Sequence, residues 1–279
     1  MFLAILQGVS ELFPISSLGH TVLIPALLRW KIDRSDPTFL AFVVVLHLGT
    51  AIALLVFYRK TWAKIVVAFV QSIVRGRFDG SRDERIAWLL VAGTIPVGIL
   101  GVAFEKSVRQ LFASPVLAAA FLVANAFVMF FGEWLRRRQI GGRREDVRPL
   151  EAIGWRAAIG IGFAQGLALF PGISRSGASI VGGLLAKMNH EDAARYSFLL
   201  ATPVILAASV LEIPALLQPD VHGVLLESVV GGIVAGVTAY FSVAFLTKYF
   251  ESNDLQPFGW YCLIVGSLSL VLFTLKVVS

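Results

Sequence analysis

Six stretches of the chain are long and apolar enough to cross a lipid bilayer as helices. A bilayer core about 30 Å thick needs about 20 helical residues, a length reached at residues 38–58, 86–104, 114–135, 191–214, 223–247 and 257–276. Hydrophobic residues make up 57% of the 279 residues and charged residues 15%, whereas a soluble domain carries roughly 25% charge. The sequence therefore predicts an all-α polytopic membrane protein and excludes a soluble globular one.

Two further apolar regions, residues 1–30 and 151–188, are each interrupted near the middle by polar residues and helix breakers. The pieces on either side of each interruption are too short to cross a bilayer alone. Irregular backbone at membrane depth is tolerated only where protein buries it or where it lines a wet cavity. We therefore interpret both regions as re-entrant helix–loop–helix hairpins.

The two interrupted regions also match each other. A gap-free shift aligns five identical pairs: Gln7 with Gln165, Gly8 with Gly166, Ile15 with Ile173, Ser16 with Ser174, and Gly19 with Gly177. Since three predicted spans follow each hairpin, residues 1–150 and 151–279 of one membrane domain read as two copies of a unit. An odd number of spans per unit gives the copies opposite orientations. This predicts an inverted repeat, with the site where the interrupted helices meet.

The basic residues predict the orientation of the chain. The formal net charge is +6, and most of the 24 Lys and Arg residues lie in stretches 59–85 and 136–150. Cytoplasmic loops are enriched in Lys and Arg, which places both stretches in the cytoplasm and both termini and the first hairpin outside. The second hairpin then enters from the cytoplasm. We expect the basic stretches to contact membrane lipids, and we expect no nucleic-acid partner.

The first hairpin combines three kinds of reactive side chain. Gln7 and Glu11 are spaced i, i+4 and share one helix face, and the turn PISSLGH follows, with Ser17 and His20. A carboxylate, hydroxyls and an imidazole provide a cation ligand, a candidate nucleophile and a proton donor. The alternative is that Glu11 and His20 only pair with each other to satisfy a buried kink.

The second hairpin has the composition of an anion-binding loop. In PGISRSGAS, residues 171–179, the glycines let backbone N–H groups approach a ligand, and a helix is expected to begin after the turn. Helix N-termini favour anions, and the Arg175 guanidinium matches phosphate oxygens. The alternative partner of Arg175 is Glu11, in a structural salt bridge.

Three other polar residues within spans receive a structural interpretation. His47 is expected to be a hydrogen-bonded packing residue, and Asn125 and Glu133 are expected to join neighbouring helices. The two hairpins carry the chemistry instead. Arginine with a nest of N–H groups indicates phosphate, and apolar helices indicate a lipid tail, so the predicted substrate class is a lipid phosphate or diphosphate.

Two motifs carry a resemblance to a known family. QGVSELFPISSLGH, from Gln7 to His20, resembles the (E/Q)xxxE and PxSSxGH motifs of the bacterial undecaprenyl pyrophosphate phosphatases, the BacA/UppP family. PGISRSGAS resembles the PGxSRSxxT motif of that family. The segment LHLGT around His47 and the hairpin-plus-three-spans arrangement also fit, so the resemblance covers nearly the whole chain.

The resemblance implies an integral membrane enzyme that hydrolyses undecaprenyl diphosphate to undecaprenyl phosphate and inorganic phosphate. This reaction recycles the carrier lipid of cell-wall synthesis. The resemblance further implies a divalent cation, Mg²⁺ or Ca²⁺, and a bacterial inner-membrane location with the site open to the outer, periplasmic face. It also implies a link to resistance against bacitracin, which sequesters the substrate. A homodimer is a candidate assembly.

The resemblance also implies residue roles. Gln7 and Glu11 fall on the metal-binding acidic motif, Ser17 on the nucleophile and His20 on the proton-transfer residue. The phosphate-binding residues are Ser16, Ser174, Arg175, Ser176, Gly177 and Ser179. Two positions depart from the family pattern. Ser179 replaces a threonine but keeps a hydroxyl, and Gln7 has one carboxylate fewer, which leaves Glu11 as the main anionic ligand.

Two mechanisms and one rival function are compatible with these residues. Ser17 either attacks the terminal phosphorus or orients a water, while Arg175 neutralises charge on the transferred phosphoryl. The rival is a flippase for undecaprenyl phosphate, which would use the same anion site with or without hydrolysis. A type-2 phosphatidic acid phosphatase is disfavoured, because Val181 stands where its motif has histidine.

Overall fold

The computed structural model describes the whole chain except residues 31–35, 112–113, 141–146, 213–222, 276 and 278–279. Within this described part, every regular element is a helix. Six of these helices are long and apolar enough to cross a bilayer: Thr38–Phe57, Arg82–Phe104, Pro115–Arg138, His190–Leu211, Leu225–Tyr249 and Gln256–Thr274. They coincide with the six predicted spans, so the predicted all-α polytopic architecture is confirmed.

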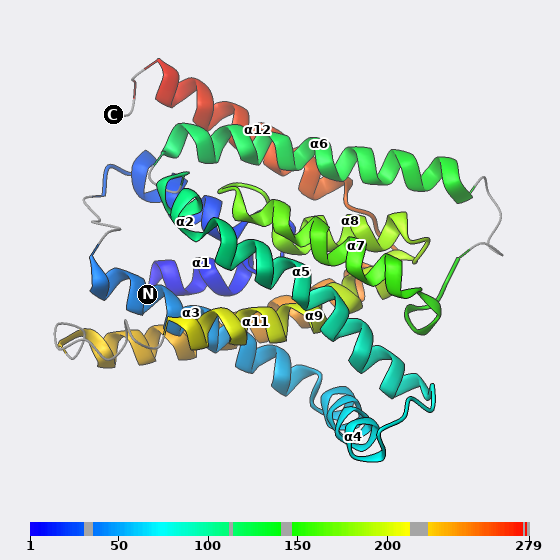
Figure 1. Cartoon of the computed structure of the whole chain (residues 1–279). Coiled ribbons are helices and arrows are strands. Elements are labelled where there is room, and N and C mark those ends of the chain that lie inside the picture. The colour runs from blue at the N-terminus through cyan, green and yellow to red at the C-terminus, as the bar shows by residue number, and fades with distance from the viewer. Residues whose placement is uncertain (31–35, 112–113, 141–146, 213–222, 276, 278–279) are drawn as a thin grey trace.

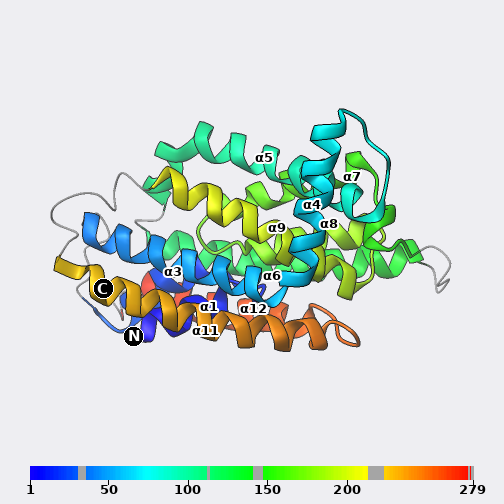
Figure 2. The same ribbon diagram turned by 90° about the horizontal axis from the view of Figure 1, so that it is seen from below.

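The long helices run roughly along one direction through the molecule (Figure 1). They are α3 (Pro37–Phe57), α5 (Arg82–Leu111), α6 (Pro115–Ile140), α9 (His190–Leu211), α11 (Leu225–Tyr249) and α12 (Gln256–Thr274). Both termini lie at one end of this bundle, and α4 (Arg59–Arg75) lies across the opposite end (Figure 2). The C-terminal end of α6, where the second basic stretch begins, lies at the same end as α4.

Each interrupted region forms two short helices joined by a loop. The first pair is α1 (Phe2–Ser10) with α2 (Ser17–Leu27), and the second is α7 (Trp155–Gly166) with α8 (Arg175–Leu185). The pairs approach from opposite ends of the bundle (Figure 1), and their loops meet inside it. There a Cβ on Gly19 would lie only 2.9 Å from the Cα of Gly172. Entry of the two pairs into a bilayer from opposite faces stays a prediction.

The two loops end in the same kind of helix cap. The Ser16 hydroxyl oxygen accepts a hydrogen bond from the Gly19 N–H (3.2 Å), and the Ser174 hydroxyl oxygen accepts one from the Gly177 N–H (3.1 Å). Serine is among the preferred residues for this position. The four residues are the ones that the sequence match pairs with each other. The shared cap agrees with the inverted repeat of residues 1–150 and 151–279, which stays a prediction.

The helix α4 lies within the basic stretch 59–85, which the sequence places in the cytoplasm and which contains no predicted span. It begins directly after Tyr58, which closes α3, and ends at Gly76 in the left-handed conformation, with φ of 61°. Its apolar residues recur at three- and four-residue spacing between the basic ones, which is a helical period. The high charge of the stretch hides this period when composition alone is considered.

Candidate active site

A cavity of about 360 Å³ lies where the two hairpin loops meet α3 and α9. Its polar lining includes Glu11, Ser16, Ser17, His47, Ser174 and Arg175. The remaining walls are largely apolar side chains of the spans, among them Val43, Val44, Val97, Val204, Ile205 and Ala208. The cavity therefore has a polar end built by both hairpins and an apolar side built by α3, α5 and α9.

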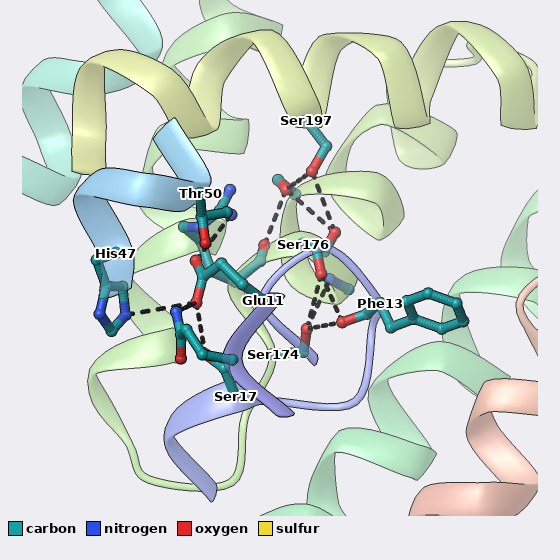
Figure 3. Close-up of polar contacts among 12 residues, drawn as sticks. Glu11, Phe13, Ser17, His47, Thr50, Ser174, Ser176 and Ser197 are labelled. Carbon is teal, nitrogen blue, oxygen red and sulfur yellow. Dashed lines mark hydrogen bonds and ion pairs between the residues drawn. The ribbon is translucent and has the colours of Figure 1, made fainter. Parts of the chain in front are cut away.

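Glu11 is the centre of the polar end (Figure 3). It follows the last residue of α1, and its side chain is 8% exposed. Its Oε2 accepts hydrogen bonds from the Ser17 hydroxyl (2.5 Å) and from Nε2 of Gln7 (3.2 Å). Its Oε1 lies 3.1 Å from Nη2 of Arg175. The ion pair between Glu11 and Arg175, which the sequence leaves open as the alternative for Arg175, is thus present and joins the two hairpins.

Ser17 is the first residue of α2 and directs its hydroxyl at the Glu11 carboxylate. The residue before it, Ser16, has φ of 70°, in the left-handed region that residues other than glycine rarely adopt. Such a conformation costs about 1–3 kcal/mol and is often found at functional sites. The bend at Ser16 turns the chain so that the Ser17 hydroxyl donates to a carboxylate, which is suited to accept its proton.

Arg175 is the first residue of α8, and its side chain is 12% exposed. Nη2 is paired with Glu11, whereas the buried Nε and Nη1 have no hydrogen-bond partner in the described part of the chain. Buried donors are nearly always hydrogen-bonded, because leaving one unpaired costs about 1–3 kcal/mol. Two unpaired guanidinium nitrogens beside the cavity indicate that an anion from outside the chain is their acceptor.

Both hairpins present a helix N-terminus at the cavity, since Ser17 begins α2 and Arg175 begins α8. A helix N-terminus carries a partial positive charge and free N–H groups, and it favours anions. The two short helices therefore reinforce the guanidinium. The polar end of the cavity is suited to hold a phosphate group.

The other predicted phosphate-binding residues are used inside the protein. Ser174 lines the cavity and caps α8. The Ser176 hydroxyl donates to the Phe13 carbonyl (3.0 Å), and the Ser179 hydroxyl donates to the Arg175 carbonyl (2.8 Å) and lies 2.6 Å from the Ser197 hydroxyl. Ser176 and Ser179 are fully buried and are absent from the cavity lining. They brace the loop that carries Arg175, outside the cavity lining.

His20 does not reach the cavity. Its Nδ1–H donates to the Ser16 carbonyl (2.7 Å), and its Nε2 lies 2.8 Å from the Tyr261 hydroxyl of α12. The pairing of Glu11 with His20, left open by the sequence, is not among the interactions of the described residues. The imidazole at Glu11 belongs to His47 instead, whose Nε2 lies 3.5 Å from Glu11 Oε2. A role of His20 in proton transfer stays a prediction.

His47 lines the cavity and contacts Glu11. The sequence predicts only a packing role for it and does not predict this contact. Its Nδ1–H donates to the Val43 carbonyl one turn earlier in α3 (2.8 Å), which directs Nε2 at the carboxylate. The sequence does contain a sign that His47 is functional, because an ionisable residue in the middle of a span is a functional candidate by default. The packing of α3 against α1, which joins the two residues, leaves no local pattern in the sequence.

Asn125, in the middle of α6, joins the two hairpin loops. Its Nδ2 donates to the Pro14 carbonyl of the first loop (3.0 Å), and its Oδ1 accepts from the Ser174 N–H of the second (3.0 Å). The side chain is fully buried. From the sequence, Asn125 is predicted to join neighbouring helices, whereas its hydrogen bonds here go to the two hairpin loops. It satisfies one backbone group in each loop and fixes the distance between them.

The donor set at the cavity does not form a complete protein cage for a metal ion. The described residues contain no cluster of three or more His, Cys, Asp or Glu side chains placed to hold one. Glu11 is the carboxylate beside Ser17, with the Gln7 amide next to it. Mg²⁺ is often held by one or two carboxylates together with substrate phosphates and waters. The residues therefore fit a cation that takes most of its oxygens from a diphosphate.

Comparisons with known proteins cover nearly the whole chain. The family described as "Bacitracin resistance protein BacA" matches residues 1–268. The chain is 47% identical to "Undecaprenyl-diphosphatase" of Mycobacterium avium, over 97% of this chain and 95% of the relative. It is 46% identical to "Undecaprenyl-diphosphatase" of Acidiphilium cryptum, over 96% and 95%. With "Undecaprenyl-diphosphatase 2" of Frankia alni the identity is 42%, over 98% and 96%.

Proposed function

We propose that this chain, which belongs to the bacitracin resistance protein BacA family, is a membrane enzyme that hydrolyses undecaprenyl diphosphate. The products are undecaprenyl phosphate and inorganic phosphate. Relatives matched over nearly their full length carry the name of this activity. The comparisons give no support to the rival flippase function. The proposed activity accounts for a cavity whose polar end suits a diphosphate and whose apolar walls suit a prenyl chain.

The observation that carries the proposal is that only one of the three guanidinium nitrogens of Arg175 has a hydrogen-bond partner in the described part of the chain. One nitrogen holds Glu11, and the other two are buried without a partner in the described part of the chain. The guanidinium is planar, and its Nε–H and Nη1–H groups point along different edges of that plane, so they can donate to different oxygens of a bound diphosphate. A terminal phosphate bound there would lie beside the helix that begins with Ser17, because both residues line the same polar end.

We propose that Glu11 is the base that accepts the Ser17 proton. In the covalent route, Ser17 Oγ attacks the terminal phosphorus, and its proton passes to Glu11 Oε2, to which it already donates. The bond from that phosphorus to the bridging oxygen breaks, and undecaprenyl phosphate leaves with the electron pair. Water then hydrolyses the phosphoserine. In the second route, Ser17 holds a water that attacks directly. Arg175 stabilises the charge on the transferred phosphoryl in both routes.

A divalent cation, Mg²⁺ or Ca²⁺, is proposed to accompany the diphosphate, with Glu11 as the protein ligand and Gln7 as a weak one. When bound, the cation would neutralise phosphate charge. Gln7 already donates to Glu11, so its main task is to hold the carboxylate. The protein contributes one carboxylate to such a site, and the affinity for the cation would then depend on the presence of the diphosphate.

We further propose that the site opens toward the outer face of the bacterial inner membrane. Glu212, which follows the last turn of α9, lines the cavity, so the cavity reaches that end of α9. Figure 2 shows this end of α9 on the same side as both termini and opposite to α4. Enrichment of Lys and Arg in cytoplasmic loops then puts the opening outside. A homodimer stays a prediction.

The test is release of inorganic phosphate from undecaprenyl diphosphate by the purified protein in detergent, with and without a chelator. We expect turnover that the chelator abolishes and that added Mg²⁺ or Ca²⁺ restores. The Arg175→Ala variant is the matched negative control, and it should lose nearly all turnover. Absence of phosphate release by a folded wild-type protein supplied with cations would refute the proposed activity. Turnover that survives the chelator would refute the proposed need for a cation, but not the proposed hydrolysis.

A further inference from the structure

The helix α4 presents three distinct faces, and the first is buried. Ile65 and Ser72 are 3% and 4% exposed. The Ser72 hydroxyl accepts a hydrogen bond from Nε1 of Trp88 in α5 (3.0 Å), and the Phe69 ring lies 5.1 Å from the Trp88 ring, between centroids. This face fixes α4 against α5, so the direction of its other two faces is determined by the fold.

The second face of α4 is apolar and exposed. It consists of five side chains that are each at least half exposed: Val66, Val67, Val70, Ile73 and Val74. At 3.6 residues per turn these positions form one continuous stripe along the helix. Beside it, an apolar hollow of about 500 Å³ runs between α4 and α5, lined by Trp62, Val66, Phe69, Val91, Ile95 and Ile99. An exposed apolar surface of this kind requires an apolar neighbour.

The third face of α4 is basic. Lys60, Lys64, Gln71 and Arg75 follow one another at helical spacing and are all exposed. Arg75 is paired with Asp79 (2.5 Å), beyond the end of the helix. The helix itself, residues 59–75, contains four basic residues and no acidic one. The two lysines therefore remain as positive charges along one edge of the apolar stripe.

The orientation of α4 explains why both faces are needed. Both views show α4 lying across the end of the bundle, whereas the spans run along it (Figures 1 and 2). Because spans cross the bilayer, a helix perpendicular to them lies in the plane of the membrane surface. A helix in that plane keeps its apolar face among acyl chains and its Lys and Arg residues among headgroups. Anionic headgroups complement the basic face.

We propose that α4 is an in-plane anchor whose apolar stripe enters the acyl region of the leaflet and whose lysines bind anionic phospholipid headgroups. The occupant is the lipid leaflet on the side of the basic stretches. This binding surface is separate from the hydrolytic cavity, since no residue of α4 lines that cavity. Because α4 follows α3 directly, the anchor would hold the C-terminal end of α3 at the membrane surface; His47 lies in the middle of α3.

Single-cysteine labelling tests the depth of each face. The native Cys262 is buried, so a fluorophore should react with cysteine introduced at Val70 or Gln71, and the labelled wild type measures the background. In vesicles of phosphatidylcholine and phosphatidylglycerol, the probe at Val70 should be quenched by brominated acyl chains. The probe at Gln71 should be quenched by aqueous iodide. Equal access of iodide to both positions would overturn the in-plane assignment.

Charge substitution tests the lipid preference. The Lys60→Gln/Lys64→Gln variant should lose preference for phosphatidylglycerol over phosphatidylcholine, measured by competition for a fluorescent lipid, by roughly fivefold for each lysine. The Lys60→Arg/Lys64→Arg control should keep the preference, and added salt should weaken it. Hydrolysis in uncharged detergent should equal wild type in both variants, which reports an intact fold. A Gln variant with undiminished preference would overturn the headgroup assignment.

Discussion

Replacing Arg175 by lysine separates the geometry of the guanidinium from its charge. In the structure, Nη2 holds Glu11 Oε1 at 3.1 Å, while Nε and Nη1 stay buried without partners in the described part of the chain. A lysine ammonium keeps one positive charge, but all of its N–H donors are on one nitrogen. We expect it to remain paired with Glu11, because both side chains are buried and an uncompensated carboxylate there is costly. The phosphate then loses its two guanidinium donors.

The expected loss follows from the two missing hydrogen bonds. A hydrogen bond to a charged group contributes about 1.5–3 kcal/mol, so two of them contribute about 3–6 kcal/mol. That corresponds to a fall of about 10²–10⁴-fold in kcat/KM for Arg175→Lys. Arg175→Ala also leaves Glu11 without its guanidinium partner, and breaking a buried pair costs about 3–5 kcal/mol of stability. Alanine should therefore lower both activity and the unfolding temperature, whereas lysine should lower activity with a much smaller change in stability.

The assay is phosphate release from undecaprenyl diphosphate in detergent, with thermal unfolding followed by tryptophan fluorescence on the same samples. Arg137→Lys is the matched control, since Arg137 pairs with Asp254 at the surface (3.3 Å) and lies away from the cavity lining. It should behave as wild type in both measurements. Retention of kcat/KM within about tenfold of wild type by Arg175→Lys would show that charge alone suffices. The proposed role of the two unpaired nitrogens would then be wrong.

Three further substitutions probe the site. Ser17→Ala should abolish turnover on the covalent route and prevent phosphorylation detectable by mass spectrometry; substantial residual turnover would exclude that route. Asn125→Ala should leave the Pro14 carbonyl and the Ser174 N–H without partners, at about 1–3 kcal/mol each, and so lower the unfolding temperature and kcat together. An unchanged unfolding temperature would contradict this. Gly172→Ala should destabilise the protein, because φ is 108° and the added Cβ would lie 2.6 Å from the Leu122 nitrogen. Gly160→Ala, with open space around its Cβ, should be neutral or stabilising by up to about 1 kcal/mol.

Local sequence patterns predict the spans and the main reactive residues. Uninterrupted apolar length identifies a span whatever surrounds it, and the observed helices agree with those predictions. Glu11, Ser17 and Arg175 stand in short polar segments that interrupt apolar sequence, so a place for them inside the helix bundle is predicted without knowing the fold. Their meeting in one cavity also follows, once two interrupted regions are recognised as partners.

The parts that the sequence does not predict depend on which helices become neighbours. His47 reaches Glu11 only because α3 packs beside α1, and Asn125 reaches both loops only because α6 passes them. The direction of His20 depends on the backbone bend at Ser16 and on Tyr261, far away in the sequence. None of these contacts produces a local pattern. Motif position alone assigns proton transfer to His20, whereas the imidazole that lies beside Glu11 is that of His47.

The charge balance of the cavity depends on the acid of one hairpin and the guanidinium of the other. Glu11 and Arg175 neutralise each other at 3.1 Å, which lowers the cost of holding two ions in an apolar surround. A diphosphate adds several negative charges, and beside Glu11 the described part of the chain sets the Arg175 guanidinium (3.1 Å) and the His47 imidazole (3.5 Å) at the polar end. The helix N-termini contribute only partial charges. The protein alone therefore leaves negative charge unbalanced when the substrate binds. The proposed divalent cation, arriving with the diphosphate, would restore the balance without a preformed protein cage.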